Sequence, residues 1–235
     1  MKTVDVCLTP ELLSQHDLSN QTVVVVDILR ATSSMVTAFA HGVERIRPVA
    51  HPEACRTWRT QGYLIAGERD GEKIADFDLG NSPLEYQPDR VRSQSLAMTT
   101  TNGTLAIAKA REARRLIIGS FLNLKAVADF LTAQETSVVV VCAGWKGHVN
   151  LEDTLFAGAL ADRLRDRFQI GSDAALMAGV AYRAAQPDLL NFLSQSSHVR
   201  RLQQLGRQED IKFCLRQSLY EVIPVLEDGC LVALA

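Results

Sequence analysis

The run Thr99 to Thr104 follows the apolar segment Ser95 to Met98 and brings hydroxyl, amide and glycine groups to a point where a strand would turn into a helix. A helix N-terminus presents unpaired backbone N–H groups and partial positive charge, so small polar residues there can bind a phosphate or sulfonate oxygen. An Asn-Gly turn with Thr104 as N-cap would use the same residue types. The run therefore predicts an anion cradle or a simple turn. The residues of the cradle would be Thr100, Thr101, Asn102, Gly103 and Thr104.

Asp27 directly follows the four valines Val23 to Val26 and so stands at the end of a strand that we expect to be buried. An ionised carboxylate is costly there unless a metal, a cation or backbone donors compensate it. An ion pair with Arg30 or capping of the next helix would also explain Asp27. A phosphoaspartyl nucleophile of the haloacid dehalogenase type would need a second aspartate at the position of Leu29. The pattern therefore favours Asp27 as a magnesium ligand.

Two further pairs of charged residues follow predicted strands. Glu68 and Arg69 combine a carboxylate for a metal with a guanidinium for an anion, although exposed loop charges would look the same. Glu152 and Asp153 open a predicted helix, where Asn150 and Asp153 also fit a capping box. Because these acids come without a histidine or cysteine cluster, they favour Mg²⁺ over zinc.

Two other motifs have both a structural and a functional interpretation. The segment Phe77 to Pro83 is rich in turn formers, and Asn81 or Ser82 can either cap a short helix at Pro83 or contribute to a site. Cys142 ends an apolar strand and is either a nucleophile partnered by Asp27 or a small buried side chain. No histidine motif accompanies it.

The elements that must position these residues alternate along the chain. We expect strands at Val4 to Leu8, Thr22 to Leu29, Arg45 to Val49, Tyr63 to Ala66, Leu96 to Thr99, Leu116 to Ile118 and Val138 to Cys142. We expect helices at Ser33 to His41, Pro52 to Gln61, Thr104 to Glu112, Asn123 to Ala133 and Leu151 to Phe168. This alternation predicts a three-layer α/β/α fold with a mostly parallel or mixed sheet. The carboxyl ends of parallel strands share one edge, so the polar motifs should converge there.

The pattern changes after Gly171. Residues 172–218 read as helices broken near Pro187 and Gly206, and two short strands should return around an Asp228-Gly229 turn. We expect one domain over residues 1–235, with any division into two lobes near residues 120–170.

Composition limits the functional class. With 47% hydrophobic residues in 235, the chain can bury a large core, and a net charge of -2 argues against nucleic acid or a membrane as partner. We interpret the short basic run His198 to Arg201 as a solvated helix face. Five scattered cysteines and no apolar leader or membrane-length segment predict a cytoplasmic protein. Its partner should be a small anionic phosphorylated substrate, and a homo-oligomer is compatible with the sequence.

The ordered set of motifs resembles the 2-phosphosulfolactate phosphatase family, known as ComB. The resemblance spans about Val23 to Gly158 and rests on Val26 to Ser33, Ala66 to Arg69, Phe77 to Pro83, Thr99 to Thr104, Cys142 to Gly144 and Leu151 to Thr154. It implies a magnesium-dependent acid phosphatase that converts (2R)-2-phospho-3-sulfolactate into sulfolactate and phosphate, a step of coenzyme M biosynthesis.

With this resemblance, we expect Asp27, Glu68 and one or both of Glu152 and Asp153 to hold Mg²⁺. Arg30 and Arg69 would clamp anionic groups of the substrate, and Asp78 is a candidate general acid. Further binding residues would be Asn81, Ser82, Gly144 and the cradle after Met98. The alternatives are a cysteine hydrolase that uses Cys142 and a non-catalytic module that binds an anionic metabolite.

Overall fold

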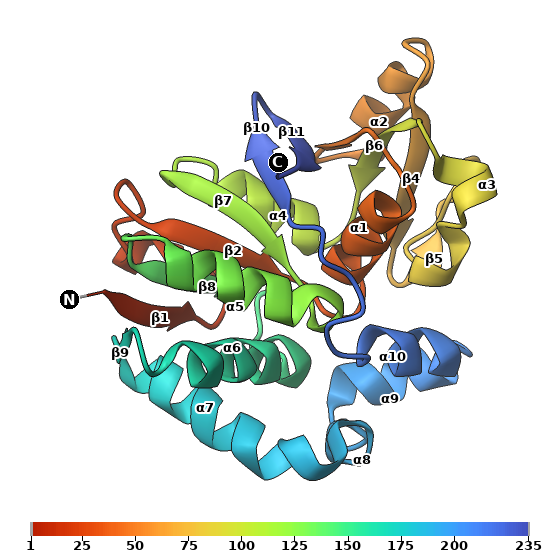
Figure 1. The fold of residues 1–235 in the computed structure, drawn as a ribbon. Helices are drawn as coiled ribbons and strands as arrows, with labels where there is room; N and C mark the ends of the chain where they lie inside the picture. The colour runs from red at the N-terminus through yellow and green to blue at the C-terminus, as the bar shows by residue number, and fades with distance from the viewer. Residues whose placement is uncertain (1, 235) are drawn as a thin grey trace.

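The computed structural model describes residues 2–234 as one mixed sheet with helices on both faces. The strand order is β5-β4-β6-β3-β11-β10-β7-β2-β8-β1-β9. Two parallel groups, β7-β2-β8-β1-β9 and β3-β6-β4, are joined by the antiparallel hairpin β10–β11 (Figure 1). The predicted α/β/α class with a mixed, mostly parallel sheet is confirmed.

The first parallel group forms the deepest part of the sheet. Its strands are β1 (Thr3–Cys7), β2 (Thr22–Val26), β7 (Arg115–Gly119), β8 (Val138–Cys142) and β9 (Gln169–Ile170). All five residues of β2 are buried, and alternate valines pack into the hydrophobic clusters on opposite faces of the sheet. A strand covered on both faces needs apolar residues at every position, which explains the unbroken valine run.

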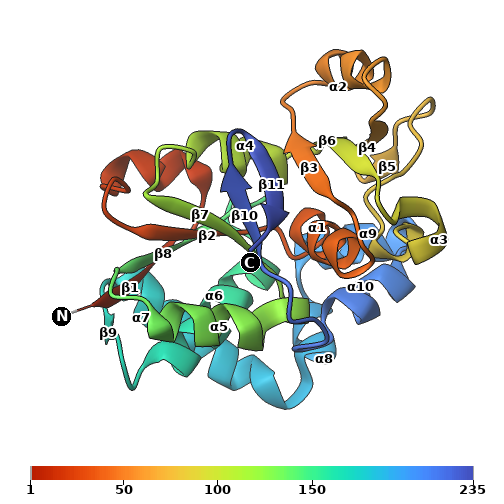
Figure 2. The same cartoon turned by 45° about the horizontal axis from the view of Figure 1, so that its top comes forward.

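Helices complete the outer layers of this group. One face is covered by α5 (Leu124–Ala133), α6 (Leu151–Leu164) and α7 (Asp173–Ala185), which share a cluster with Val24 and Val26. The other face is covered by α1 (Ala31–Ala40) and α4 (Gly103–Lys109), which pack against Val23 and Val25. The view in Figure 2 shows α5, α6 and α7 on the opposite side of the strands from α4.

The second parallel group repeats this arrangement on a smaller scale. It consists of β3 (Arg45–Pro48), β4 (Leu64–Arg69) and β6 (Ser95–Thr99), with the short β5 (Glu72–Lys73) antiparallel to β4. The helix α2 (Pro52–Arg59) packs on one face through Cys55, and α1 packs on the other. The short η2 (Pro83–Glu85) and α3 (Pro88–Val91) lead back to β6. Since α1 belongs to both halves, it lies between the two parallel groups.

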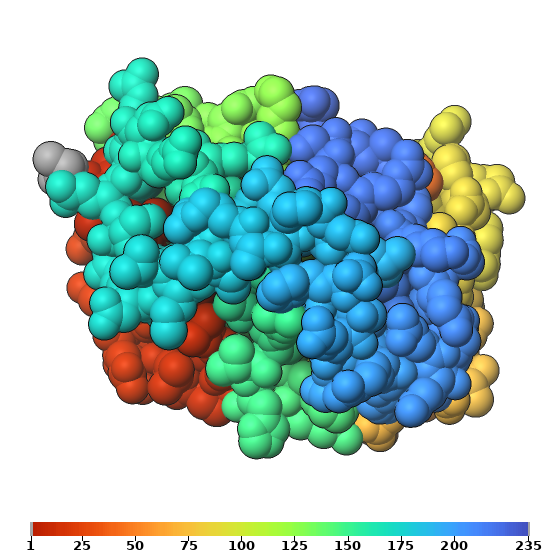
Figure 3. All heavy atoms as spheres, turned by 90° about the horizontal axis from the view of Figure 1, so that it is seen from below, coloured from red at the N-terminus to blue at the C-terminus, as the bar shows by residue number. Residues whose placement is uncertain are grey.

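The remaining residues after Gly171 form short helices and a hairpin, as the sequence predicts. The predicted break near Pro187 separates α7 from α8 (Leu189–Leu193), and the one near Gly206 separates α9 (Ser197–Gln204) from α10 (Gln208–Cys214). A third break, at residues 194–196, separates α8 from α9. Figure 3 shows these helices, coloured cyan to blue, spread over one face of the molecule. The strands β10 (Pro224–Glu227) and β11 (Cys230–Ala233) meet at Asp228 and Gly229, whose positive φ angles of 48° and 75° suit a tight hairpin turn.

Several element boundaries differ from the predictions at positions where polar residues follow apolar ones. The strand predicted over residues 22–29 ends at Val26, and residues 27–30 form the connection into α1. The helix predicted to reach residue 168 ends at Leu164. The strand predicted to end at Ala66 continues to Arg69, so Glu68 belongs to β4 itself. Among the described residues, no helix has both the length and the apolar character needed to cross a bilayer.

Candidate active site

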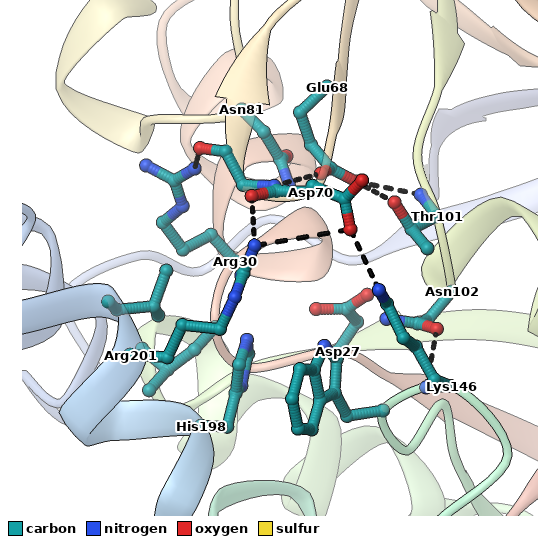
Figure 4. A pocket seen from close by; sticks show the side chains of 14 residues that line it. Asp27, Arg30, Glu68, Asp70, Asn81, Thr101, Asn102, Lys146, His198 and Arg201 are labelled. Atoms are coloured by element: carbon teal, nitrogen blue, oxygen red, sulfur yellow. Dashed lines mark hydrogen bonds and ion pairs between the residues drawn. The ribbon is translucent and has the colours of Figure 1, made fainter. Parts of the chain in front are cut away.

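A polar pocket opens between the two parallel groups and is closed on its outer side by α9 (Figure 4). Six residues that the sequence singled out line it, namely Asp27, Arg30, Glu68, Asn81, Thr101 and Asn102. They come from the β2–α1 connection, the end of β4, the segment before η2 and the loop between β6 and α4. The predicted convergence of polar motifs from separate strand ends is thus present for these six.

Asp27 is one of two buried acids that line the pocket, the other being Glu68. Its Oδ1 accepts a hydrogen bond from the Ala31 backbone N–H at 3.2 Å. Burial raises its pKa to about 6, and the carboxylates of Glu68 and Glu152 add to the rise, whereas the Ala31 hydrogen bond and His198 oppose it. A Cβ atom at position 103 would lie 2.9 Å from Asp27 Oδ2. Because Gly103 has no side chain, the start of α4 can lie close to Asp27. Asp27 is therefore a carboxylate that a nearby cation would stabilise.

Glu68 holds two loops in place at the pocket wall. Its Oε1 accepts hydrogen bonds from the backbone N–H and the hydroxyl of Thr101, at 2.7 and 2.8 Å. Its Oε2 accepts one from the Gly71 N–H at 2.7 Å. The carboxylate thus fixes the β4–β5 turn against the threonine run, and its side chain lines the pocket.

Arg30 enters the pocket with its charge already balanced. Its guanidinium forms a buried ion pair with Asp210 of α10 and donates to the Gly71 carbonyl at 2.8 Å. The Ser82 hydroxyl donates to the second oxygen of Asp210 at 2.6 Å. Ser82 therefore acts on the pocket through Asp210, while Arg30 can contact an anion directly.

Glu152 and Asp153 lie behind the pocket lining and are fully buried. Glu152 Oε1 lies 2.5 Å from Nδ1 of His198, and Ser196 donates to its other oxygen at 3.4 Å. Asp153 accepts hydrogen bonds from the backbone N–H groups of Ile28 and Gly144 and from the side chain of Asn150. Glu152 therefore orients a histidine, and Asp153 joins the ends of β2 and β8 to the start of α6.

His198 lines the pocket and is only 7% exposed. Because Nδ1 faces Glu152, its Nε2 is the free nitrogen, with no hydrogen-bond partner among residues 2–234. The ring stacks on Trp145, with centroids 5.5 Å apart and an interplanar angle of 18°. A histidine fixed by a carboxylate, with its second nitrogen toward a cavity, is suited to proton transfer.

The side-chain oxygen atoms of the residues that line the pocket are suitable ligands for Mg²⁺. Asn81 Oδ1 is buried and accepts no hydrogen bond from the described part of the chain, and Asp27 Oδ2 likewise accepts none there. Residues 2–234 hold no cluster of three or more His, Cys, Asp and Glu side chains arranged around a metal. Mg²⁺ is commonly bound by one or two carboxylates together with substrate phosphate and water, so it does not need such a cluster. Asp27, Glu68 and Asn81 therefore fit this ion.

Other predicted residues lie outside this pocket. Asp78 accepts a hydrogen bond from the Ile65 N–H at 2.8 Å and pairs with Arg59 on the surface. Arg69 donates to Thr99 Oγ1 at 2.9 Å and lines a second pocket with Thr100 and Thr104. Gly144, at φ 64°, donates its N–H to Asp153.

The threonine run combines the two roles expected from its sequence. Thr100 and Thr104 form hydrogen bonds with each other and so stabilise the turn into α4, while Thr101 and Asn102 line the first pocket.

Cys142 lacks the surroundings of a nucleophile. It is completely buried in the core and does not line the pocket. Burial raises its pKa well above the usual value, and the nearby carboxylates of Asp153 and Glu152 add to the rise. The thiol therefore stays protonated, as in a structural cysteine.

Two pocket residues, His198 and Arg201, carry no strand-end signal in the sequence, whereas Asp70, Trp145 and Lys146 follow closely after β4 and β8. The interpretation of His198 to Arg201 as a solvated face is wrong, because His198 is buried and Arg201 closes the pocket. His198 and Arg201 are three positions apart and therefore lie on the same face of α9. This spacing is the one feature of the sequence that indicates that the two side chains belong to the same site.

The pocket therefore combines buried carboxylates, an arginine and a carboxylate-bound histidine. The cationic groups can bind the oxygens of an anionic ester, and the histidine beside them can donate a proton. These are the groups that phosphoryl or acyl transfer requires.

Comparison with known proteins narrows this choice. The family model described as 2-phosphosulpholactate phosphatase matches residues 7–229. A relative from Caldanaerobacter subterraneus subsp. tengcongensis is 38% identical over 222 residues, which are 92% of each chain. Relatives from Thermotoga maritima and Synechocystis are 40% and 36% identical over 212 and 224 residues, covering 90% and 92% of this chain and 92% of each relative. All three bear the name probable 2-phosphosulfolactate phosphatase.

Proposed function

The chain belongs to the 2-phosphosulfolactate phosphatase family, and from this premise we propose that it is a magnesium-dependent phosphatase. Its substrate is (2R)-2-phospho-3-sulfolactate, which it hydrolyses to (2R)-3-sulfolactate and phosphate, the reaction type of coenzyme M biosynthesis. The observation that carries this proposal is the pocket in which Asp27 and Glu68 face Arg30 and His198. The five free cysteines, all buried, suit the reducing cytoplasm that we propose as its location.

The cationic and acidic groups divide the work of binding the phosphoryl group. Arg30, held by Asp210, donates charge-assisted hydrogen bonds to phosphoryl oxygens from a fixed guanidinium. Asp27, Glu68 and the free Oδ1 of Asn81 would hold Mg²⁺. When bound, this ion supplies charge neutralisation for the phosphoryl group and orientation for the attacking water.

His198 supplies the proton that the leaving group needs. Hydrolysis forms a bond from water oxygen to phosphorus and breaks the bond from phosphorus to the substrate's alkoxide oxygen, which must then take up a proton. The free Nε2 of His198 donates it, while Glu152 contacts Nδ1 and holds the ring in its orientation. Asp78, the candidate from sequence, has no access to the pocket and is left out of this role.

A phosphate-release assay on 2-phosphosulfolactate tests the proposal. We expect turnover with Mg²⁺, loss of turnover with EDTA, and a decrease of at least ~100-fold in Asp27→Asn, because a metal contributes several kcal/mol to stabilising transition-state charge. Mg²⁺ should raise the melting temperature of the wild-type protein more than that of Asp27→Asn. Cys142→Ser is the matched control, since Cys142 is buried outside the pocket, and it should retain turnover.

Two outcomes would replace the proposal. Turnover that is indifferent to EDTA but lost in Cys142→Ser would support a cysteine hydrolase. Tight anion binding without hydrolysis of any phosphomonoester would support a non-catalytic module.

A further inference from the structure

An ion-pair cluster crosses the mouth of the pocket. Asp70, in the β4–β5 turn, lies between Lys146 of the β8–α6 loop and Arg201 of α9 (Figure 4). Lys146 Nζ is 2.9 Å from Asp70 Oδ1, and Arg201 donates to the Asp70 carbonyl with a guanidinium nitrogen that is 4.0 Å from the same Oδ1. Three segments that are far apart in sequence thus meet around one carboxylate.

The two cations of this cluster differ from Arg30 in how their charge is balanced. Arg30 has the buried partner Asp210, whereas Lys146 and Arg201 have Asp70 as their one acidic partner among residues 2–234. The Asp70 side chain is 66% exposed. Exposed ion pairs contribute little net free energy, so an incoming anion can replace Asp70 at small cost.

The cations also lie close to the reacting groups. Arg201 and Lys146 stand 5.8 and 5.9 Å from the centre of the Trp145 ring, and that ring stacks on His198. A group bound by the two cations is therefore held beside the proton donor proposed above. A Cβ atom at position 71 would lie 3.2 Å from Arg201 Nη1, so Arg201 lies beside Gly71, the turn residue that Glu68 and Arg30 both contact. The cluster is one wall of the same pocket.

We propose that Lys146 and Arg201 bind a second strong anion of the substrate, a sulfonate or carboxylate carried next to the phosphate, and that Asp70 occupies this subsite until substrate displaces it. A guanidinium fork and an ammonium group together match the several oxygens of such an anion. A phosphomonoester without a second anion leaves Asp70 in place. The subsite thus selects polyanionic esters, and this inference rests on the proposed phosphatase function for its substrate class.

Calorimetric binding of the product 3-sulfolactate tests the subsite without turnover. Each of Lys146→Gln and Arg201→Gln should raise the Kd about tenfold, the value of one charge-assisted hydrogen bond. Asp70→Asn should lower the Kd severalfold, because the amide no longer competes with the ligand for the two cations. Lys125→Gln and Arg183→Gln are matched controls that remove exposed cations paired elsewhere, and they should leave the Kd unchanged.

Kinetic measurements identify which anion the subsite binds. 2-Phosphoglycerate keeps the carboxylate but has a hydroxyl in place of the sulfonate, and ethyl phosphate lacks both. If the cations bind the sulfonate, Lys146→Gln lowers the ratio of kcat/KM for 2-phosphosulfolactate to that for 2-phosphoglycerate. If they bind the carboxylate, it lowers the ratio for 2-phosphoglycerate to that for ethyl phosphate. Either result supports the subsite.

The inference fails if Lys146→Gln and Arg201→Gln both keep the Kd within twofold of wild type. It also fails if Asp70→Asn weakens binding as the cation variants do, since Asp70 would then be a structural clamp and not a competitor. A protein that binds 3-sulfolactate through Lys146 and Arg201 but hydrolyses no ester would keep the subsite and refute the phosphatase. A working phosphatase with unaffected variants would do the reverse.

Discussion

Asp27, Glu68, Glu152 and Asp153 carry the same functional group in four different environments. Asp153 accepts hydrogen bonds from three protein donors, and Glu68 also accepts three. Glu152 is bound to His198, and the Asp27 carboxylate accepts one hydrogen bond, from a backbone N–H. Asp153 lies outside the pocket and its charge is satisfied by its donors, so its value is structural, whereas Glu68 lines the pocket and can share a cation with Asp27, which has the fewest donors. The reactivity of the pocket therefore concentrates on Asp27 and His198.

The role of His198 as proton donor predicts a dependence on the leaving group. His198→Gln removes the donor, so kcat for an alkyl phosphate should fall by about 10²- to 10⁴-fold, the usual contribution of general acid catalysis. Hydrolysis of p-nitrophenyl phosphate should fall much less, because nitrophenolate leaves without a proton. Glu152→Gln should show the same preference with a smaller loss, since Glu152 acts by positioning the ring. Steady-state kinetics with both esters measures this.

His148→Gln serves as the control for that comparison. His148 is exposed and its side chain makes no hydrogen bond within the described residues, so both esters should be hydrolysed at the wild-type rate. An equal loss for both esters in His198→Gln would contradict the proton-donor role and leave His198 as a binding group.

The convergence of side chains on one pocket was predictable from sequence for residues attached to predicted strand ends. Asp27, Glu68 and Thr101 follow or end apolar strands, and parallel strands bring such positions to one edge of the sheet. His198 and Arg201 lie on α9, a short helix whose sequence shows which face is apolar but not which surface that face covers. Docking of α9 depends on contacts with residues more than a hundred positions away, such as Asp70. No local pattern contains that information.

The helices and strands themselves were largely predictable because each type of element has a characteristic spacing of apolar residues in the sequence. Runs such as Val138–Cys142 are apolar at every position, as strands covered on both faces require, and Asp228-Gly229 is a hairpin signal. The insertion of β10–β11 between β7 and β3 was not predictable, because short strands pair through side-chain fit that the sequence does not state. Predicted strand positions were therefore more accurate than strand order.

The packing of α6 against α7 predicts a strict requirement for glycine at position 158. A Cβ there would lie 2.0 Å from the Ala178 carbonyl oxygen of α7, so the two helices would have to move apart. Gly158→Ala should lower the free energy of unfolding by about 1–3 kcal/mol, the usual cost of overpacking a core. Urea unfolding followed by circular dichroism measures the change.

Gly179→Ala is the matched control on the partner helix. Its new Cβ would meet the flexible end of Arg183 at 3.3 Å and no backbone atom. Since alanine is the better helix former, this variant should be neutral or more stable by up to about 1 kcal/mol. A Gly158→Ala protein as stable as Gly179→Ala would show that the α6–α7 contact adapts.

At the scale of the molecule, the pocket exists because the C-terminal helices close over two parallel strand groups. Arg30 precedes α1 and Ser82 precedes η2, and Asp210 of α10 joins both. His198 and Arg201 of α9 reach the same pocket from the same side. The catalytic arrangement is therefore a property of the closed molecule, and the Arg30–Asp210 pair is its buried connection.

This buried pair predicts that stability and activity separate in a double variant. Asp210→Asn leaves the Arg30 charge buried without a partner, so it should lower the free energy of unfolding by about 3–5 kcal/mol and reduce kcat/KM. Combining Arg30→Met with Asp210→Leu removes both charges, and most of the lost stability should return because apolar groups of similar size can replace a buried pair. Activity should be lost in the double variant, since it removes the guanidinium that we propose contacts the substrate. Asp162→Asn is the control: it breaks an exposed pair with Arg183 and should lower the free energy of unfolding by no more than about 1 kcal/mol.

Urea unfolding and phosphate release, measured on the same samples, test this prediction. A double variant as unstable as Asp210→Asn would show that the ion pair supplies net stability. A double variant that still releases phosphate would show that Arg30 is not part of the site.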